Sequence, residues 1–270
     1  MKPFTILYFG DVVGKIGRTA LMNVLPDMKR RYAPDLTIAN VENLTHGAGI
    51  APKQLQVLAD VGVDAFTSGN HVWENPDGLA MLDDPAWAGR LIRPANMRRG
   101  EPGRGSAVYK TKDGVSVLLV NLMGQVLFPE TVESPFTSLD TIIASHTSDR
   151  PNVVFVDFHA EATSEKEALG HYADGRVAAL VGSHTHVPTA DAKILPGGTA
   201  YCTDVGRVGA YDSVIGFEKK GVLERFLTGG DMPYDIPKKG QSEVNGIAVR
   251  VDVQTGRATG LDRIREFVEC

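Results

Sequence analysis

Short apolar runs rich in β-branched residues alternate with helix-like stretches along the first third of the chain, and this alternation restricts the fold more than any other feature. Strands are predicted where each run ends in a polar or turn residue: TILYFG, LTIANVE, DAFTSGN and LIRPAN. Helical periodicity covers residues 18–33 between the first two runs and residues 51–62 between the next two. Alternation of this kind favours β-α-β units and a parallel sheet.

Two hairpins interrupt this pattern. Residues 106–123 contain two strand-like runs around Asp113-Gly114, which is a strong hairpin signal. Residues 245–267 repeat the arrangement, with a turn at Thr255-Gly256. The chain therefore mixes parallel and antiparallel strands.

Three more strand-like runs occupy the second half of the chain: NVVFVDFHAE, VAALVGSHTHV and TAYCTDVG. A helix is predicted over residues 164–176, where Ser164 and Glu167 have the spacing of a capping box. Together with the hairpins, these runs predict an α/β fold of two packed sheets with outer helices. We expect it to form one domain over residues 1–270.

Composition excludes several classes of protein. The 270 residues are 43% hydrophobic, and 28 basic against 33 acidic residues give a net charge of −5. No block of Lys or Arg stands out, so we expect no long nucleic acid as a partner. Cys202 and Cys270 form neither a disulfide framework nor a thiolate metal motif, FTILYF is too short for a signal peptide, and no run approaches a membrane span. We therefore expect a cytoplasmic protein without a membrane partner.

The stretch ILYFGDVVGKIGR combines features that conflict. Gly10, Gly14 and Gly17 follow an apolar run at a helix start, which is the layout of a loop that binds phosphate through backbone N–H groups. Their spacing matches neither the dinucleotide nor the mononucleotide fingerprint. Asp11 also stands at the tip, where a carboxylate repels phosphate. A nicotinamide-dependent dehydrogenase is therefore a weak interpretation, and it leaves the histidines unexplained.

Polar residues cluster directly after five of the predicted strands, where open α/β sheets place their ligand sites. They are Asp11, Glu42, Asn43, Asn70, His71, His159, His184 and His186. Singly, most of these residues are ordinary caps, turn residues or packed histidines. His184 and His186 differ, because residues two apart in an extended segment face the same side and two neutral imidazoles there suit a metal. The set as a whole predicts a metal site.

The number of candidate ligands indicates two ions. Leaving His71 aside, seven candidates exceed what one catalytic ion with open positions uses. Two divalent ions about 3.5–4 Å apart form the clamp used for in-line displacement at phosphorus. With a bridging hydroxide, Asp11 and Glu42, such a centre has a net charge of +1 and attracts a phosphodiester. Asp11 would then hold the cation that holds the phosphate.

At this point the motifs resemble those of the calcineurin-like metallophosphoesterases, and specifically of their YmdB-like branch. The resemblance rests on FGDVVGKIGR, VENLTHGAGI, SGNHVWE, RPAN, FHAEATSEK and GSHTHVPTAD, from about residue 4 to about residue 267. The chain departs from the broad superfamily where Val13 replaces the histidine of D-x-H, Glu42 replaces the bridging aspartate, Val72 follows His71, and Ser183 is inserted before His184. These departures belong to the YmdB-like pattern.

The resemblance implies a four-layer α/β/β/α sandwich and a phosphodiesterase acting on cyclic nucleotides, with 2′,3′-cyclic and also 3′,5′-cyclic nucleotides as substrates. It implies one metal held by Asp11, Glu42, Asn43 and His186, and a second held by Glu42, Asn70, His159 and His184. An oxygen-rich shell at Asn43 favours iron or manganese over zinc, cobalt or nickel. His71 is then the general acid that protonates the leaving alkoxide.

Alternatives stay open at this stage. One is a regulatory protein that binds a nucleotide at the metal site, with incidental turnover; His71 has little purpose in such a protein. His46, Lys15, Arg18 and Arg207 could contact phosphate or serve structure, and Asp157 could orient a ligating histidine. The segments MLDDPAWAG and FLTGGDMPYDI offer apolar surface for a homo-oligomer.

Overall fold

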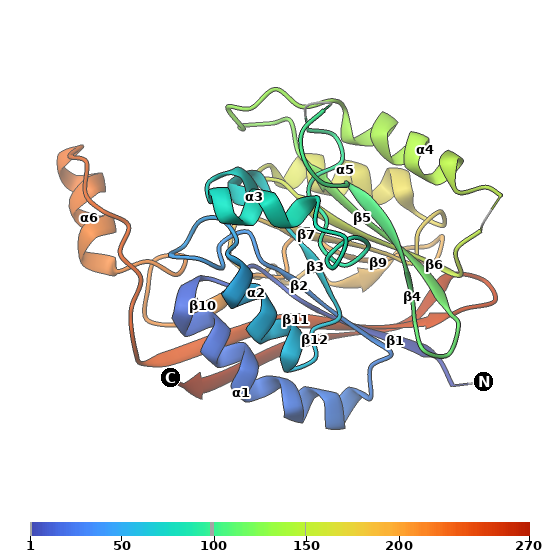
Figure 1. The fold of residues 1–270 in the computed structure, drawn as a ribbon, viewed down its shortest axis with the longest axis horizontal. Coiled ribbons are helices and arrows are strands. Elements are labelled where there is room, and N and C mark those ends of the chain that lie inside the picture. Colours follow the sequence, from blue (N-terminus) through green and yellow to red (C-terminus); the bar gives the residue numbers. More distant parts are fainter. Residues whose placement is uncertain (1, 98–99, 149) are drawn as a thin grey trace.

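The computed structural model describes residues 2–97, 100–148 and 150–270, and its framework is a pair of mixed β-sheets. Each sheet has six strands in the described part of the chain, and helices cover their outer faces (Figure 1). Figure 1 shows α4 and α5 on one side of the sheets and α1 on the opposite side, with α6 projecting away from the rest. This is the predicted α/β/β/α layering, and the fold prediction is confirmed.

The first sheet is built around the N-terminal strand. Its members are β1 (Phe4–Phe9), β2 (Leu36–Asn40), β3 (Ala65–Thr67), β10 (Val208–Ala210), β11 (Gln241–Asp252) and β12 (Arg257–Glu269). β1, β2 and β3 run parallel, whereas β11 pairs antiparallel with β1, β10 and β12. The C-terminal hairpin β11–β12 turns where the sequence predicts it.

The second sheet has a parallel centre with antiparallel edges. Its order is β4 (Ser106–Lys110), β5 (Ser116–Met123), β6 (Val153–His159), β7 (Ala179–Ser183), β9 (Ala200–Cys202) and β8 (Lys193–Ile194). β5, β6, β7 and β9 are parallel, and the antiparallel β4–β5 pair is the hairpin predicted around Asp113-Gly114.

Helices fill the two outer layers. They are α1 (Gly14–Tyr32), α2 (Pro52–Asp60), α3 (Pro76–Leu82), α4 (Pro135–Ser145), α5 (Thr163–Ala173) and α6 (Lys219–Thr228), with a short 3₁₀ turn η1 (Asn70–Trp73) after β3. α1, α2 and α3 pack on the first sheet through one apolar cluster, and α4 and α5 pack on the second sheet through another. No helix in the described ranges is long and apolar enough to span a membrane.

Alternation of side chains along the strands separates the layers. In β1, Leu7 and Phe9 face the helices of the first sheet, whereas Ile6 and Tyr8 belong to the cluster between the two sheets. In β5, Leu119 lies in the same inter-sheet cluster, while its neighbours along the strand face α4 and α5. Both faces of each central strand are therefore buried, which explains why these strands are continuous apolar runs in the sequence.

Two local predictions are wrong. The run LIRPAN makes only an isolated bridge, from Leu91 to Phe66, because after Ile92 its backbone bonds leave β3, with Arg93 donating to Arg104 and Ala95 to Asn121 of β5. Helix α5 starts at Thr163, so Ser164 lies inside its first turn rather than at its N-cap, and the N-cap Ala162 makes no side-chain capping bond. The Ser164/Glu167 pair therefore cannot form a capping box.

The two segments expected to offer apolar surface behave differently. Residues 81–89 place Met81, Leu82 and Trp87 in the core against the first sheet. By contrast, α6 exposes Phe226 and Leu227, with 83% and 84% of each residue accessible. Apolar surface is thus found on the projecting helix rather than near α3.

A buried carboxylate joins the two sheets. Asp157, on β6, accepts hydrogen bonds from Tyr8 Oη at 2.8 Å and Asn40 Nδ2 at 3.0 Å, and also from Thr67 Oγ1, all in the first sheet. Ser183 Oγ, on β7, donates to its other oxygen at 2.7 Å. Burial raises the pKa of Asp157, and the bonds from Thr67 and Ser183 act in the opposite direction. One side chain therefore satisfies donors from three strands of the opposite sheet.

We predict that Asp157→Ala lowers the free energy of unfolding by about 3–4 kcal/mol, because it leaves several buried donors without an acceptor. Asp113→Ala, at the exposed tip of the β4–β5 hairpin, is the matched control and should change stability by less than about 0.5 kcal/mol. Urea unfolding followed by circular dichroism measures both. Equal midpoints for the two variants would contradict the structural role of Asp157.

Candidate metal centre

The polar residues predicted from strand ends meet at the carboxyl edge of both sheets. Asp11 follows β1, and Glu42 and Asn43 follow β2. Asn70 and His71 lie in η1 after β3. The second sheet contributes His159, the last residue of β6, and the loop after β7 contributes His184 and His186. The site is thus built from two sheets, and the structure brings all the predicted ligand candidates together there.

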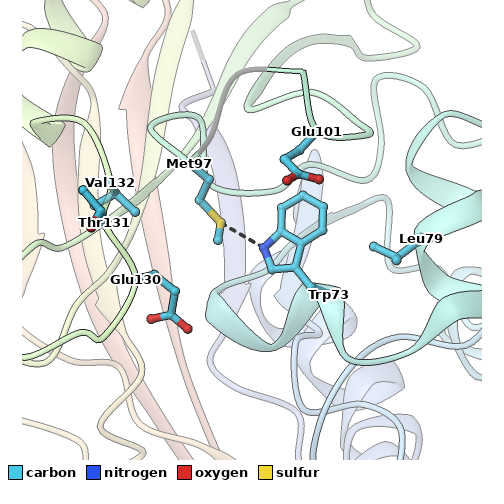
Figure 2. A pocket seen from close by; sticks show the side chains of 7 residues that line it. All are labelled: Trp73, Leu79, Met97, Glu101, Glu130, Thr131 and Val132. Atoms are coloured by element: carbon cyan, nitrogen blue, oxygen red, sulfur yellow. Dashed lines mark hydrogen bonds between the residues drawn. The ribbon is translucent and has the colours of Figure 1, made fainter.

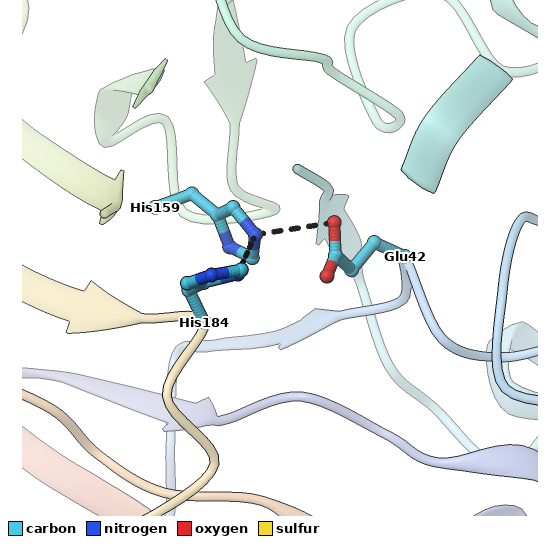
Figure 3. A group of neighbouring side chains, drawn as sticks. All are labelled: Glu42, His159 and His184. Atoms are coloured by element: carbon cyan, nitrogen blue, oxygen red, sulfur yellow. Dashed lines mark hydrogen bonds and ion pairs between the residues drawn. The ribbon is translucent and has the colours of Figure 1, made fainter. Parts of the chain in front are cut away.

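Glu42 is shared by two groups of potential ligands. In one group, ligand atoms of Glu42, His159 and His184 all lie within 4.8 Å of one another (Figure 3). In the other, the same holds for Asp11, Glu42 and His186. Together the two groups contain five side chains, and they form two adjoining three-residue clusters that share the Glu42 carboxylate.

His159 stands at the centre of the first group. Its Nε2 lies 3.2 Å from Glu42 Oε2, 3.1 Å from His184 Nδ1 and 3.0 Å from Asn70 Oδ1. Figure 3 shows the two rings and the Glu42 carboxylate turned toward one another. Four donor atoms from four segments therefore converge on one point.

The second group gathers around His186. Its Nε2 lies 3.1 Å from Asn43 Oδ1, which places the amide oxygen among the potential ligand atoms. Asp11 Oδ2 accepts the backbone N–H of His184 at 3.2 Å, and this bond fixes the carboxylate relative to the histidine loop. Asp11, Glu42 and Asn43 are all buried.

Hydrogen bonds at Nδ1 orient the rings of His159 and His186. Because Ser183 donates to Asp157, its Oγ accepts from His159 Nδ1 at 2.9 Å. His186 Nδ1 donates to the carbonyl oxygen of Ile215 at 2.7 Å. In His159 and His186 the remaining nitrogen, Nε2, is the one directed at the cluster, and it would present its lone pair to a bound metal.

His184 faces the cluster with its other ring nitrogen. Its Nδ1 lies 3.1 Å from His159 Nε2, whereas its Nε2 points outward and lies 3.3 Å from Glu161 Oε2. Burial, together with the nearby His159, lowers the pKa of His184 to about 2. The ring is therefore neutral, the form that coordinates a metal.

The buried carboxylates lack partners that a cation would supply. Asp11 Oδ1 and Glu42 Oε1 are buried and have no hydrogen-bond partner among the described residues. Burial raises the pKa of Asp11 to about 8; His159 opposes this rise, and the charge of Glu42 adds to it. Carboxylate and amide oxygens with imidazole nitrogens suit borderline divalent metals. The residues present therefore fit metal ions.

The histidine loop is held in a strained conformation. His184 has φ 97° and His186 has φ 64°, in a region that residues other than glycine seldom adopt. The fully buried Lys166 donates to the carbonyl oxygen of Ser183 and to Asp204 Oδ2, both at 2.7 Å, and Asp204 accepts the N–H of Thr185 at 3.2 Å. This buried ion pair fixes the loop on both sides of His184.

His71 lies at the rim of the cluster. About a third of its side chain is exposed, and its Nδ1 contacts the Glu74 carboxylate. Its backbone N–H donates to Glu42 Oε2 at 3.1 Å, so η1 is tied to the shared carboxylate. A Cβ on Gly69 would lie 2.2 Å from Glu42 Oε2 and 2.3 Å from His159 Nε2, which makes glycine necessary beside the ligands.

The residues whose roles the sequence leaves open are mostly structural. Arg207 is buried and donates to the carbonyl oxygens of His186 and Ala210. Arg18 donates to the carbonyl oxygen of Leu44. His46 and Lys15 are exposed.

Sequence reasoning missed several residues that support the site. Lys166, Asp204 and Ser183 act through contacts between residues far apart in the sequence, so no local pattern marks them. Glu74 has a local signal, because it stands three residues after His71 within a single turn. Phe128 packs on the ring of His184 with centroids 4.8 Å apart, and it lies in a loop with no motif.

Relatives share both the length and the fold of the chain. A Bacillus subtilis protein named 2′,3′-cyclic-nucleotide 2′-phosphodiesterase is 42% identical over 96% of each chain. A Mycoplasma genitalium protein named as a putative phosphatase/phosphodiesterase is 35% identical over 98% of this chain and 94% of its own.

Solved structures agree with these relatives. A crystal structure described as a novel phosphatase from Mycoplasma pneumoniae superposes with a TM-score of 0.91 at 35% identity, covering 100% of this chain and 95% of the other. A Thermus thermophilus protein described as hypothetical gives a TM-score of 0.89 at 38% identity, covering 98% and 99%. The names of the relatives agree with the predicted phosphodiesterase.

The family assignment rests on the whole chain rather than on one motif. A family model described as "YmdB-like protein" matches residues 7–264, a span that contains every candidate ligand. The resemblance read from the motifs is thereby confirmed: the chain belongs to the YmdB-like protein family.

Proposed function

We propose that this protein is a dinuclear metal-dependent phosphodiesterase that hydrolyses cyclic nucleotides, 2′,3′-cyclic nucleotides first and 3′,5′-cyclic nucleotides as further substrates. The observation that carries the proposal is the sharing of Glu42 between two adjoining ligand groups. A carboxylate with two oxygens can bridge two cations, and its Oε1 has no other partner in the part of the chain that the structure describes. The name of the Bacillus subtilis relative supports the substrate class.

Each ion would have its own ligands besides Glu42. Asp11, Asn43 and His186 would complete the first set, and Asn70, His159 and His184 would complete the second. The first set is richer in oxygen, which favours iron or manganese there. Bound divalent ions would supply Lewis acidity at a phosphoryl oxygen and an activated water.

The electrostatic balance of the site favours an anionic substrate. With cations bound, Asp11 and Glu42 would both be ionised and contribute two negative charges, and the neutral His184 adds none. Two divalent cations would therefore leave the centre positive, as the binding of a phosphodiester requires. Phosphate affinity would then come from the ions.

His71 would protonate the leaving alkoxide. The Glu74 carboxylate contacts Nδ1 and fixes the ring, and Nε2 is left to donate to the leaving oxygen. The backbone bond from His71 to Glu42 keeps the acid at the rim of the shared carboxylate. A protein that only binds nucleotides needs no such acid, so the His71–Glu74 pair favours turnover.

We predict that Glu42→Gln loses bound metal and activity together, because one neutral amide replaces the carboxylate common to both ligand groups. Metal content per chain, measured on protein purified without chelator, and hydrolysis of adenosine 2′,3′-cyclic phosphate give the two readouts. Glu167→Gln on the exposed face of α5 removes the same charge and should leave metal content and hydrolysis unchanged. In the unaltered protein, chelation should abolish activity and added Mn or Fe should restore it. Full activity of metal-free Glu42→Gln would refute the proposal.

We predict that His71→Ala keeps its metal and slows hydrolysis of the cyclic nucleotide by about 10²–10⁴-fold, the usual contribution of a general acid. Cleavage of bis(p-nitrophenyl) phosphate should fall far less, because nitrophenolate leaves without protonation. His171→Ala, on α5, is the control for loss of an exposed imidazole. Equal losses on both substrates would assign His71 a structural role instead.

A further inference from the structure

A cavity of about 350 Å³ lies beside η1, at the lower end of the size range of small-molecule sites. Figure 2 shows the Trp73 indole in the middle of the lining side chains, with Met97 and Glu130 on one side and Leu79 on the other. The walls are mainly apolar, and two carboxylates and one hydroxyl interrupt them. The lining residues are Trp73, Leu79, Met97, Glu101, Glu130, Thr131 and Val132.

This cavity adjoins the metal centre. Trp73 ends the same 3₁₀ turn that begins with Asn70 and carries His71. Phe128 packs on the ring of His184 and also on the apolar cluster that contains Trp73, Met97 and Val132. η1 and Phe128 therefore adjoin both the metal centre and the cavity.

Trp73 is held as a rigid platform. Its indole N–H donates to Met97 Sδ at 3.3 Å, which fixes the rotation of the ring. The buried Arg93 places its guanidinium 5.8 Å from the ring centroid, on the protein side. Trp73 is partly exposed and lines the cavity, and aromatic stacking accepts every nucleobase.

Glu130 supplies a polar group without a partner. Its Oε2 is buried and has no hydrogen-bond partner within the described ranges. Glu101 also lines the cavity, but it is exposed and its charge interacts with Arg93. Of the two carboxylates, Glu130 is the one with a vacant acceptor, and its side chain would have to turn toward the cavity to present both oxygens to a ligand.

We propose that this cavity binds the base of the cyclic nucleotide, that Trp73 stacks on it, and that Glu130 selects guanine. The inference rests on the proposed phosphodiesterase function and names the substrate class within it. A carboxylate is a pure acceptor with two oxygens. The N1–H and N2–H groups of guanine stand side by side and can donate to both oxygens at once.

The other bases fit the same carboxylate less well. Adenine and cytosine each offer one amino group, and the ring nitrogen beside it is an acceptor that repels the second oxygen. Uracil places carbonyl oxygens on both sides of its single N–H. The unaltered protein should therefore prefer guanosine 2′,3′-cyclic phosphate to the uridine compound by about 10- to 100-fold in kcat/KM, as a good bidentate contact provides.

The kinetic test compares matched variants on three substrates: guanosine 2′,3′-cyclic phosphate, uridine 2′,3′-cyclic phosphate and methyl riboside 2′,3′-cyclic phosphate, which has no base. Glu130→Gln should remove the preference for guanosine and leave cleavage of the base-free substrate unchanged. Glu101→Gln makes the same charge change in the same cavity and should keep the preference. Trp73→Leu should raise KM for both nucleosides by about 5- to 100-fold and leave the base-free substrate unaffected.

A binding measurement separates this inference from catalysis. In a Trp87→Phe background Trp73 is the single tryptophan, and its fluorescence in chelator-treated protein should be quenched by guanosine 2′,3′-cyclic phosphate more than by the base-free compound. Base-free and nucleotide substrates cleaved equally well, with no quenching, would overturn the base pocket and leave the phosphodiesterase intact. Absence of cleavage for all three substrates would overturn the proposed function, while selective quenching would still support the pocket.

Discussion

The buried carboxylate of Asp157 is the contact on which the geometry of the site depends. It accepts hydrogen bonds from β1, β2 and β3 of the first sheet and from Ser183 of the second. Ser183 in turn accepts from His159, so the same network sets the ring orientation of a candidate ligand. A buried carboxylate is costly unless its acceptors are satisfied, and here donors from both sheets satisfy it only when the sheets are in register. The packing of the two sheets therefore also fixes the orientation of a candidate ligand.

The candidate ligands divide between the sheets in the same way. Asp11 and Glu42 follow strands of the first sheet, whereas His159 and His184 belong to the second. Metal ions bound between them would add a link across the interface at its carboxyl edge, above the link that Asp157 makes inside it. His184 and His186 have unfavourable backbone conformations, and the buried Lys166–Asp204 pair stabilises the loop that contains them. Rigid support of this kind positions ligands before a cation arrives.

The sequence predicts the elements and the ligand candidates because both leave local signals. Buried parallel strands are apolar runs, and the polar residues that follow them are close by in the chain, as Asp11 is two positions after Phe9. The supporting contacts leave no such signal: Asn40 and Asp157 meet 117 positions apart. The wrong capping box reflects a two-residue difference in the N-cap of α5, which is Ala162 and not Ser164. LIRPAN fails as a strand because only Leu91 finds a bridge partner. In both segments the structure depends on contacts with the rest of the fold, and the sequence of a single segment does not reveal those contacts.

The glycine-rich turn after β1 shows how packing can imitate a ligand motif. A Cβ on Gly10 would lie 1.7 Å from the carbonyl oxygen of Gly206, and one on Gly17 would lie 2.3 Å from that of Val208, so both glycines allow backbones to approach. The N–H groups of Val12, Val13 and Gly14 already donate to backbone carbonyls. The turn therefore has few free N–H donors for a phosphate, and the start of α1 does not form a phosphate-binding loop. An acid at position 11 is compatible with this turn because the turn positions the Asp11 side chain and does not bind phosphate. A phosphodiester bound nearby must be held by other groups.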